Sequence, residues 1–192
     1  MGCSTLSNIK MFGPIEHIER SVFQNCTALQ HITLPDSLIS IDKKAFKSTG
    51  LLDIAIPSNT TTIGKKAFYK CNALATLTIP KTVSFIGKEA FAKCPALSQI
   101  DLPSITTIEE QMFEECSSLK EISIPSSVVT IGRSAFHQCS SLSTVIIPSS
   151  VKYIESKAFK QCSSLLEIKI PNPSCSYTEN SFEVYTHVVK NE

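Results

Sequence analysis

The sequence predicts an α/β solenoid of about eight units, each 22 or 23 residues long, with one parallel sheet and short helical turns on the opposite side. Three features that recur in step support this fold class: a phenylalanine, a pair of alternating apolar residues, and a proline directly after most of the pairs. The phenylalanines keep their spacing through the chain and are Phe23, Phe46, Phe68, Phe91, Phe113, Phe136, Phe159 and Phe182.

The apolar pair of each unit predicts a short β-strand. Its two members are separated by one residue, as in Ile122 and Ile124, and most of them are β-branched. This alternation is typical of a strand with one buried face. In seven units a proline follows and ends the strand, because proline cannot donate a ladder hydrogen bond. These prolines are Pro35, Pro57, Pro80, Pro103, Pro125, Pro148 and Pro171.

Two further apolar positions, such as Val128 and Ile131, cross from the strand to a predicted helical turn. The turn itself has the form Ala135-Phe136-His137-Gln138-Cys139. Alanine, phenylalanine and cysteine at relative positions 1, 2 and 5 suit one face of a single helical turn. We therefore expect columns of phenylalanine and cysteine inside the solenoid.

A unit of 22 or 23 residues is too small to fold alone, so neighbouring units must share burial and strand hydrogen bonds. Residues 1–192 are accordingly predicted as one solenoid domain. Residues 1–28 form an N-terminal unit that opens in mid-repeat, and residues 29–164 form the regular repeats. Residues 165–192 form a degenerate C-terminal capping unit, in which Val188 takes the leucine slot and no strand follows it. The open N-terminal rung offers a surface for self-association.

Two units are one residue shorter than the others. One lacks a residue in the turn Ser48-Thr49-Gly50, and the other lacks a residue after Pro103. Both deletions fall in predicted turns, where changes in length are tolerated.

The charge of the chain is almost balanced, with 18 Lys and Arg residues against 17 Asp and Glu residues. A net charge of +1 provides no general field for a nucleic acid or an acidic membrane, so we expect no nucleic-acid partner. No apolar run of 18 residues is present, which predicts no membrane insertion. The N-terminal residues also lack the basic segment and apolar core of a signal peptide.

The cysteines are expected to be buried thiols that pack as small apolar side chains. Seven of them share one slot of the repeat, whereas Cys175 lies outside it and is expected to be exposed and reactive. The chain has no Cys-x-x-Cys pair and no zinc-type spacing of Cys and His, so no metal site is predicted. The four histidines form no catalytic motif and are expected on the solvated surface, and no glycine-rich phosphate loop is present. We therefore predict neither an enzyme nor a cofactor. The seven cysteines are Cys3, Cys26, Cys71, Cys94, Cys116, Cys139 and Cys162.

The repeat Leu-x-x-Ile-x-Ile-Pro-x-Ser-Val-x-x-Ile-Gly-x-x-Ala-Phe-x-x-Cys-x-x-Leu resembles the BspA-like class of leucine-rich repeat. Residues 74–96, 119–141 and 142–164 match it most completely, and the resemblance covers essentially the whole chain. It implies a right-handed leucine-rich-repeat solenoid with the parallel sheet on the concave face and the helical turns on the convex side. It also implies a bacterial or trichomonad surface protein that attaches to host matrix proteins, host cells or other microbes.

The strand residues that alternate with the buried ones are the candidate binding residues. Eight strands spaced by about 4.8 Å would give a surface roughly 35 Å long. Such a surface suits another protein, or a glycan as the second choice, rather than a small molecule. It is mixed in character and mildly acidic, without aromatic anchors. The candidates are His31, Thr33, Asp53, Thr76, Thr78, Gln99, Asp101, Glu121, Ser123, Thr144, Ile146, Glu167 and Lys169.

Charges on the predicted helical side change sign along the chain. A basic stripe is followed by an acidic group, which is either an ordinary solvated face or, on its basic half, a contact for an anion or glycan. The stripe contains Lys43, Lys44, Lys47, Lys65, Lys66, Lys70, Lys88 and Lys93, and the acidic group contains Glu109, Glu110, Glu114 and Glu115.

Two functional hypotheses follow. The resemblance favours a non-enzymatic adhesion or recognition module at the cell surface, with a host or matrix protein bound along the concave sheet face. The absent signal-peptide pattern and the reduced cysteines favour the alternative, an intracellular scaffold or a structural component of a larger assembly, with a cytoplasmic location.

Overall fold

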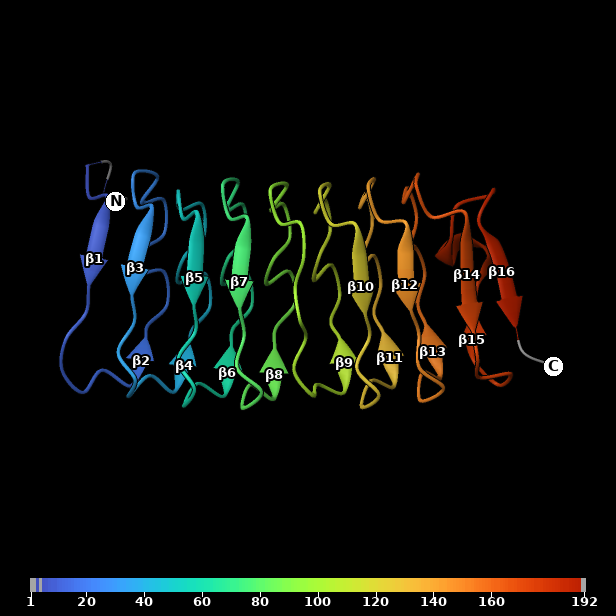
Figure 1. Cartoon of the computed structure of the whole chain (residues 1–192), viewed down its shortest axis with the longest axis horizontal. Coiled ribbons are helices and arrows are strands. Elements are labelled where there is room, and N and C mark those ends of the chain that lie inside the picture. Colours follow the sequence, from blue (N-terminus) through green and yellow to red (C-terminus); the bar gives the residue numbers. More distant parts are fainter. Residues whose placement is uncertain (1–2, 4, 191–192) are drawn as a thin grey trace.

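The computed structural model describes residue 3 and residues 5–190, and in it the chain forms a parallel solenoid (Figure 1). We call each turn of the solenoid a rung and number the rungs 1 to 8 by their phenylalanines, from Phe23 to Phe182. The chain runs down the front strands in Figure 1, returns behind them and moves to the next rung on the right. This path is a right-handed coil, as the family resemblance implied.

The predicted strands form one face of the solenoid, which we call the long-strand face. Neighbouring strands pair in parallel with matched repeat positions, as in Ile9 opposite Ile32 and Ile122 opposite Val145. In the described residues Gln99–Asp101 follow the same path without strand geometry, in the unit shortened after Pro103. The strands are β1 (Asn8–Lys10), β3 (His31–Thr33), β5 (Asp53–Ala55), β7 (Thr76–Thr78), β10 (Glu121–Ser123), β12 (Thr144–Ile146), β14 (Glu167–Ile170) and β16 (His187–Lys190).

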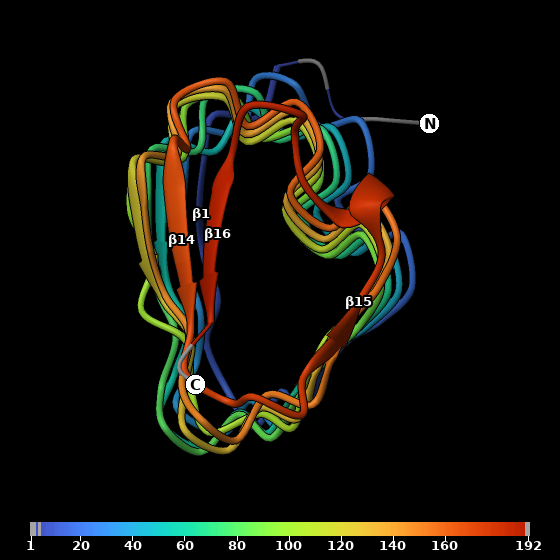
Figure 2. The same ribbon diagram turned by 90° about the vertical axis from the view of Figure 1, so that its right-hand side faces the viewer.

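The long-strand face is not hollowed, contrary to the concave face that the family resemblance implied. Seen along the solenoid in Figure 2, the terminal strands β1 and β16 are set back from the strands of the middle rungs. The face is therefore bowed gently outward.

A second series of short strands lies across the solenoid from the long-strand face (Figure 2). These strands occupy the residues that the sequence predicted only as an apolar crossing, and each of them has two residues. They form two four-stranded parallel sheets, β2-β4-β6-β8 and β9-β11-β13-β15. The strands are β2 (His17–Ile18), β4 (Ser40–Ile41), β6 (Thr62–Ile63), β8 (Phe85–Ile86), β9 (Thr107–Ile108), β11 (Thr130–Ile131), β13 (Tyr153–Ile154) and β15 (Ser176–Tyr177).

The prediction of a helical turn in each unit is wrong. Within the described residues the one helix is the short 3-10 helix η1 (Glu179–Ser181). Elsewhere the predicted helical segment is a run of turns, with a residue at φ of 55° to 64° two positions before and two positions after each phenylalanine of rungs 1 to 7. A right-handed helix cannot contain left-handed residues at this spacing. These residues are Ser21, Asn25, Lys44, Ser48, Lys66, Lys70, Glu89, Lys93, Gln111, Glu115, Ser134, Gln138, Lys157 and Gln161.

Hydrogen bonding between rungs explains why turns replace the helix. The amide of Phe46 donates to the carbonyl of Ala67 in the next rung at 2.8 Å, and the amide of Lys44 donates to Lys65 at 3.0 Å. The intervening amide of Ala45 instead donates within its own rung, to Asp42 at 3.1 Å. A helix would use all of these amides internally. The turns therefore close each rung and also join it to the next rung by hydrogen bonds.

The phenylalanines form a continuous stacked column, as the sequence predicted. Ring centroids of successive rungs lie 5.1–5.7 Å apart, and their planes are within 15° of parallel. The rings of rungs 2 to 7 are fully buried, whereas Phe23 at the first rung is half-buried. This column is the centre of the apolar core.

The cysteine column is also present in the core. Each thiol from rung 3 to rung 7 donates to the carbonyl of the phenylalanine in the preceding rung, at Sγ–O distances of 3.0–3.2 Å. Two expectations were wrong, because Cys3 is exposed and Cys175 is buried. Burial of Cys175 also raises the pKa of its thiol. The last unit still follows the path of the solenoid, so it covers Cys175 although its sequence has diverged from the repeat.

The C-terminal unit ends in a strand that the 23-residue period did not predict. Strand β16 pairs in parallel with β14, and Val188 lies opposite Ile168. Val188 is therefore in a strand position rather than in the leucine slot. The hydroxyl of Thr186 donates to the carbonyl of Leu165 at 2.8 Å and fixes this register.

Replacement of Gly50 by alanine is expected to lower the free energy of unfolding by about 1–3 kcal/mol. Gly50 lies in the shortened turn of rung 2, and an added Cβ would overlap the backbone carbonyl of Thr27 in the preceding rung. Relief of this overlap requires the rungs to separate. Urea unfolding followed by circular dichroism measures the change. Ser118→Ala alters the corresponding slot of a turn that has its full length, and it is expected to change stability by less than about 0.5 kcal/mol. An equal effect of the two substitutions would contradict the packing explanation.

Candidate protein-binding face

The side chains predicted for binding are all exposed on the long-strand face. In strands β3, β5, β7 and β10 the central residue is buried and the residues on either side are exposed. This pattern arises because successive side chains of a strand point to opposite sides of the sheet. The repeat therefore holds one row of side chains in the core and presents the other to solvent. Whether the exposed row binds a partner remains a prediction.

Three shallow grooves follow one another along this face. The first, of about 180 Å³, lies between β7 and residues 99–101, and the second, of about 210 Å³, lies between residues 99–101 and β12. The third, of about 370 Å³, lies between β12 and β14. Gln99 and Asp101 line both the first and the second groove, and Thr144 and Ile146 line both the second and the third. The grooves therefore form a row that an extended ligand could follow.

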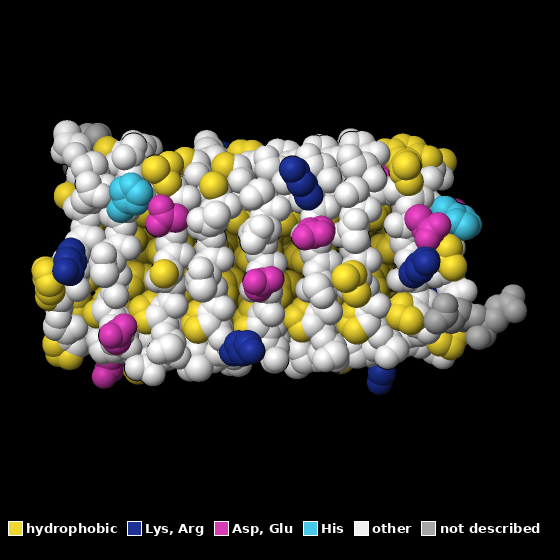
Figure 3. Space-filling view, in the orientation of Figure 1, with side chains coloured by type: hydrophobic (Ala, Val, Ile, Leu, Met, Phe, Trp, Pro, Cys, Tyr) yellow, Lys and Arg dark blue, Asp and Glu magenta, His cyan; other side chains and the backbone are white. Residues whose placement is uncertain are grey.

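The face carries isolated charges among apolar furrows (Figure 3). Near its ends the carboxylates have basic neighbours, as in Asp53 with His31 at 3.4 Å and Glu167 with Lys169 at 3.8 Å. Within the described residues Asp101 and Glu121 form no ion pair, although both line the second groove. Their carboxylates are thus available to basic groups of a partner.

Ile146 is the most exposed large apolar residue within the long strands, with 61% of its surface accessible. It lies between the second and third grooves. The sequence identified Ile146 from strand alternation, but it missed Ser143 and Pro171, which line the third groove from outside the strands. Their positions directly before a strand and directly after one are the signal that could have found them.

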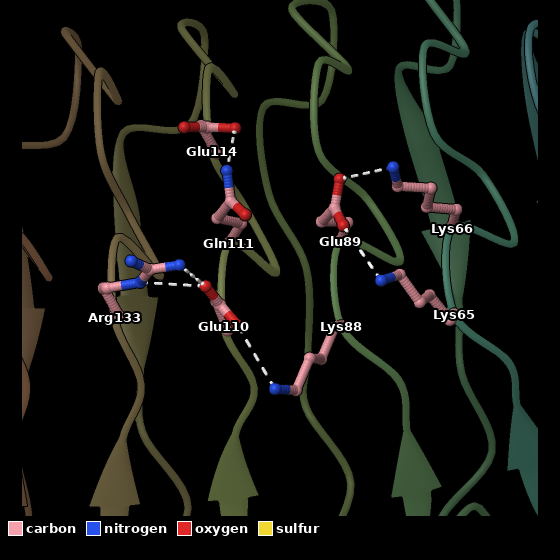
Figure 4. Close-up of polar contacts among 8 residues, drawn as sticks. All are labelled: Lys65, Lys66, Lys88, Glu89, Glu110, Gln111, Glu114 and Arg133. Atoms are coloured by element: carbon pink, nitrogen blue, oxygen red, sulfur yellow. Dashed lines mark hydrogen bonds and ion pairs between the residues drawn. The ribbon is translucent and has the colours of Figure 1, made fainter.

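The charges of the turn side form ion pairs between rungs, so they are more than a solvated surface (Figure 4). The Nζ atoms of Lys65 and Lys66 lie 3.6 and 3.0 Å from the carboxylate oxygens of Glu89. Glu110 forms ion pairs with both Lys88 and Arg133. Hydrogen bonds from Arg133 and Lys88 hold the pKa of Glu110 below its ordinary value.

His137 also lies on the turn side, and its side chain is more buried than the sequence predicted. Its Nδ1 lies 3.4 Å from Glu114, which also accepts a hydrogen bond from Gln111 (Figure 4). The expectation that all four histidines are solvated therefore fails for His137.

Other kinds of site find no support in the described part of the chain. Its His, Cys, Asp and Glu side chains form no group of three or more that could hold a metal ion. None of the helices described is long and apolar enough to cross a membrane.

The repeat pattern matches a known family model. The model described as BspA type leucine rich repeat region matches the chain in six copies, over residues 1–116 and 84–190. These two ranges together span nearly the whole sequence. No curated protein sequence matches the chain at a significant level.

Several solved bacterial structures are similar to this chain. A leucine rich repeat protein of T. pallidum is 29% identical, with 74% of this chain and 76% of that chain covered and a TM-score of 0.67. A leucine-rich repeat protein of Bacteroides ovatus is 23% identical, with 98% and 76% covered and a TM-score of 0.53. A leucine rich cell surface protein of Faecalibacterium prausnitzii is 27% identical, with 99% and 61% covered and a TM-score of 0.49. The first two likenesses agree with the solenoid seen here.

Proposed function

This chain belongs to the family of BspA-type leucine-rich repeat proteins, and on that basis we propose that it is a non-enzymatic recognition module that binds a host or matrix protein along the long-strand face. Repeats of this family serve generally as protein-interaction scaffolds. The adhesion role, the partner and the location at the cell surface are parts of the proposal, and they rest on the resemblance to microbial surface proteins.

The observation that carries the proposal is the row of exposed strand residues with three consecutive grooves. The row is regular and rigid because each strand anchors its exposed residues beside a buried one, for example Glu121 and Ser123 on either side of Ile122. Its grooves are shallow and linked, which suits a broad or extended partner more than an enclosed small molecule. The mixed polar and acidic surface favours a protein with basic groups over a glycan.

An intracellular scaffold is the second candidate, and the state of the cysteines favours it. The described cysteines are all free thiols. Proteins of oxidising environments generally form disulfides, whereas thiols persist in reducing compartments. Biotinylation of intact cells separates the two candidates, because a surface module is labelled and a cytoplasmic scaffold is not.

Reversal of two charges in the second groove is expected to weaken partner binding roughly ten-fold or more. The variant is Asp101→Lys with Glu121→Lys, whose carboxylates are exposed and free of ion pairs with other described residues. Binding is measured by capture on a host extracellular-matrix extract and, separately, on a cytosolic extract of the source cells.

A second double variant controls for the change in net charge. Glu109→Lys with Glu179→Lys makes the same change away from the long-strand face, and it is expected to leave binding within about two-fold. If the two double variants bind every captured protein equally well, this face is not the binding surface. Face-dependent capture from cytosol alone would instead support the scaffold.

A further inference from the structure

A basic patch lies on the turn side of rungs 1 to 3. Four residue positions of each rung flank its phenylalanine: three and two residues before it, and one and two residues after it. In rungs 2 and 3 three of these four positions hold lysine, rung 3 also holds Tyr69, and rung 1 contributes Arg20. The basic patch consists of Arg20, Lys43, Lys44, Lys47, Lys65, Lys66 and Lys70.

The patch residues are close neighbours across rungs. The amide of Lys44 donates to the carbonyl of Lys65, and the amide of Ser48 donates to the carbonyl of Tyr69. Hydrogen-bonded strands lie about 4.8 Å apart, so like charges at one position recur at about that spacing. Adjacent like charges of this kind destabilise a parallel array.

Ion pairs neutralise the later rungs but not this patch. From rung 4 onward, Lys88 and Arg133 pair with Glu110, Lys93 pairs with Glu115 at 2.8 Å, and Lys160 pairs with Glu183 at 3.2 Å. In the patch, Lys65 and Lys66 must share Glu89 (Figure 4). The remaining cations, Arg20, Lys43, Lys44, Lys47 and Lys70, form no ion pair with any residue that the structure describes. The patch therefore has an excess of positive charge.

Three of these ammonium groups lie around the ring of Tyr69. The Nζ atoms of Lys47, Lys66 and Lys70 lie 5.6, 5.1 and 5.7 Å from the centre of its ring. A cation above an aromatic face is attracted by the ring quadrupole. The half-buried ring thus holds like charges together that would otherwise spread apart.

The fold does not require this charge. The slots of Lys44, Lys47 and Lys70 hold Gln111, Gln24 and Gln138, respectively, in other rungs. We infer that the basic patch binds a sulfated polysaccharide, whose fixed negative charges would offset the repulsion among the lysines. Nucleic acid is a poorer match because the ring of Tyr69 is surrounded by ammonium groups and offers no open stacking platform.

This surface is separate from the proposed protein-binding face. In Figure 2 the long strands β14 and β16 line one side of the rung, and the turn that contains η1 lies on the other side. The inference therefore does not depend on the proposed function, and failure of one leaves the other standing.

The test is the affinity of the folded chain for a size-defined heparin fragment at physiological salt. The triple variant Lys44→Gln, Lys47→Gln and Lys70→Gln places in each slot a residue that another rung already accepts. It is expected to bind heparin about ten-fold or more weakly than the parent. Its melting temperature is expected to be no lower than that of the parent, because repulsion among the lysines is reduced. Parent binding is expected to fall as salt is raised and to be much weaker for unsulfated hyaluronan.

The matched control removes three exposed lysines elsewhere, through Lys120→Gln, Lys152→Gln and Lys157→Gln. It is expected to bind heparin within about two-fold of the parent. No binding by the parent, or an equal loss in the control, would overturn the inference. Equal or tighter binding of duplex DNA or of anionic phosphatidylserine vesicles through the same three lysines would also overturn it, since the patch would then serve another kind of polyanion.

Discussion

Replacement of Phe113 by alanine is expected to lower the free energy of unfolding by about 3–5 kcal/mol. The ring is fully buried and stacks between Phe91 at 5.5 Å and Phe136 at 5.4 Å. Its removal leaves a cavity that both neighbouring rungs line. The loss also interrupts the coupling between the two halves of the solenoid, because each rung contacts only its neighbours. Urea unfolding followed by circular dichroism measures the effect.

Phe23→Ala is the matched control for this prediction. Phe23 is half-buried and stacks against one described ring, that of Phe46 at 5.2 Å. Its replacement is expected to cost less than half as much as that of Phe113. A loss below about 1 kcal/mol for Phe113→Ala, or equal losses at the two positions, would show that the stacked column is not the main source of stability.

Alkaline pH is expected to destabilise the protein through its buried cysteines. Burial raises the pKa of Cys116 and of Cys162 from the ordinary value of 9.0 to about 12. Ionisation therefore favours the unfolded chain: the thiols contribute their full stability below pH 9, and this contribution is lost as the pH rises toward 12. At 1.36 kcal/mol per pKa unit, Cys116 alone accounts for about 3 kcal/mol by pH 11.

Cys116→Thr isolates this effect from other groups that titrate at high pH. Threonine already fills the same slot in rung 2, where the hydroxyl of Thr49 donates to the carbonyl of Phe46 at 2.9 Å. The variant is expected to lose less stability than the parent between pH 8 and 11, by about 3 kcal/mol. The measurement is urea unfolding at several pH values in the presence of a reductant. Parallel pH profiles of the two proteins would rule out the buried thiol as the cause.

The regular core could be predicted from the sequence because its signals are periodic. Burial of Phe113, Cys116 and Ile122 follows from their repetition at 22 or 23 residues. The turns could not be predicted in the same way. Ala-Phe-x-x-Cys suits either one helical turn or a run of β-turns, and the left-handed positions hold Lys, Glu, Gln, Ser and Asn rather than glycine. The hydrogen bonds between rungs decide between these two structures.

The exposed row of the candidate site could also be predicted, since strand alternation alone places Thr78 or Ser123 outward. The grooves could not, because their depth depends on the separation of neighbouring rungs and on side-chain conformations. The ion pairs could be predicted only in part. Lys88 and Glu110 are 22 residues apart, so the repeat register places them next to each other, but the register does not show that Arg133 shares the same carboxylate.

Photo-crosslinking from two positions of one rung tests the central proposal, that partners bind the long-strand face. Ile146 in β12 and Tyr153 in β13 are 61% and 54% exposed and belong to opposite sheets of the same rung. Each is replaced in turn by benzoylphenylalanine, and the chain is irradiated in the extract from which it captures a partner. We expect a covalent adduct with that partner from position 146 and none from position 153. Adducts from position 153 alone would place the partner on the short-strand sheet and contradict the proposal.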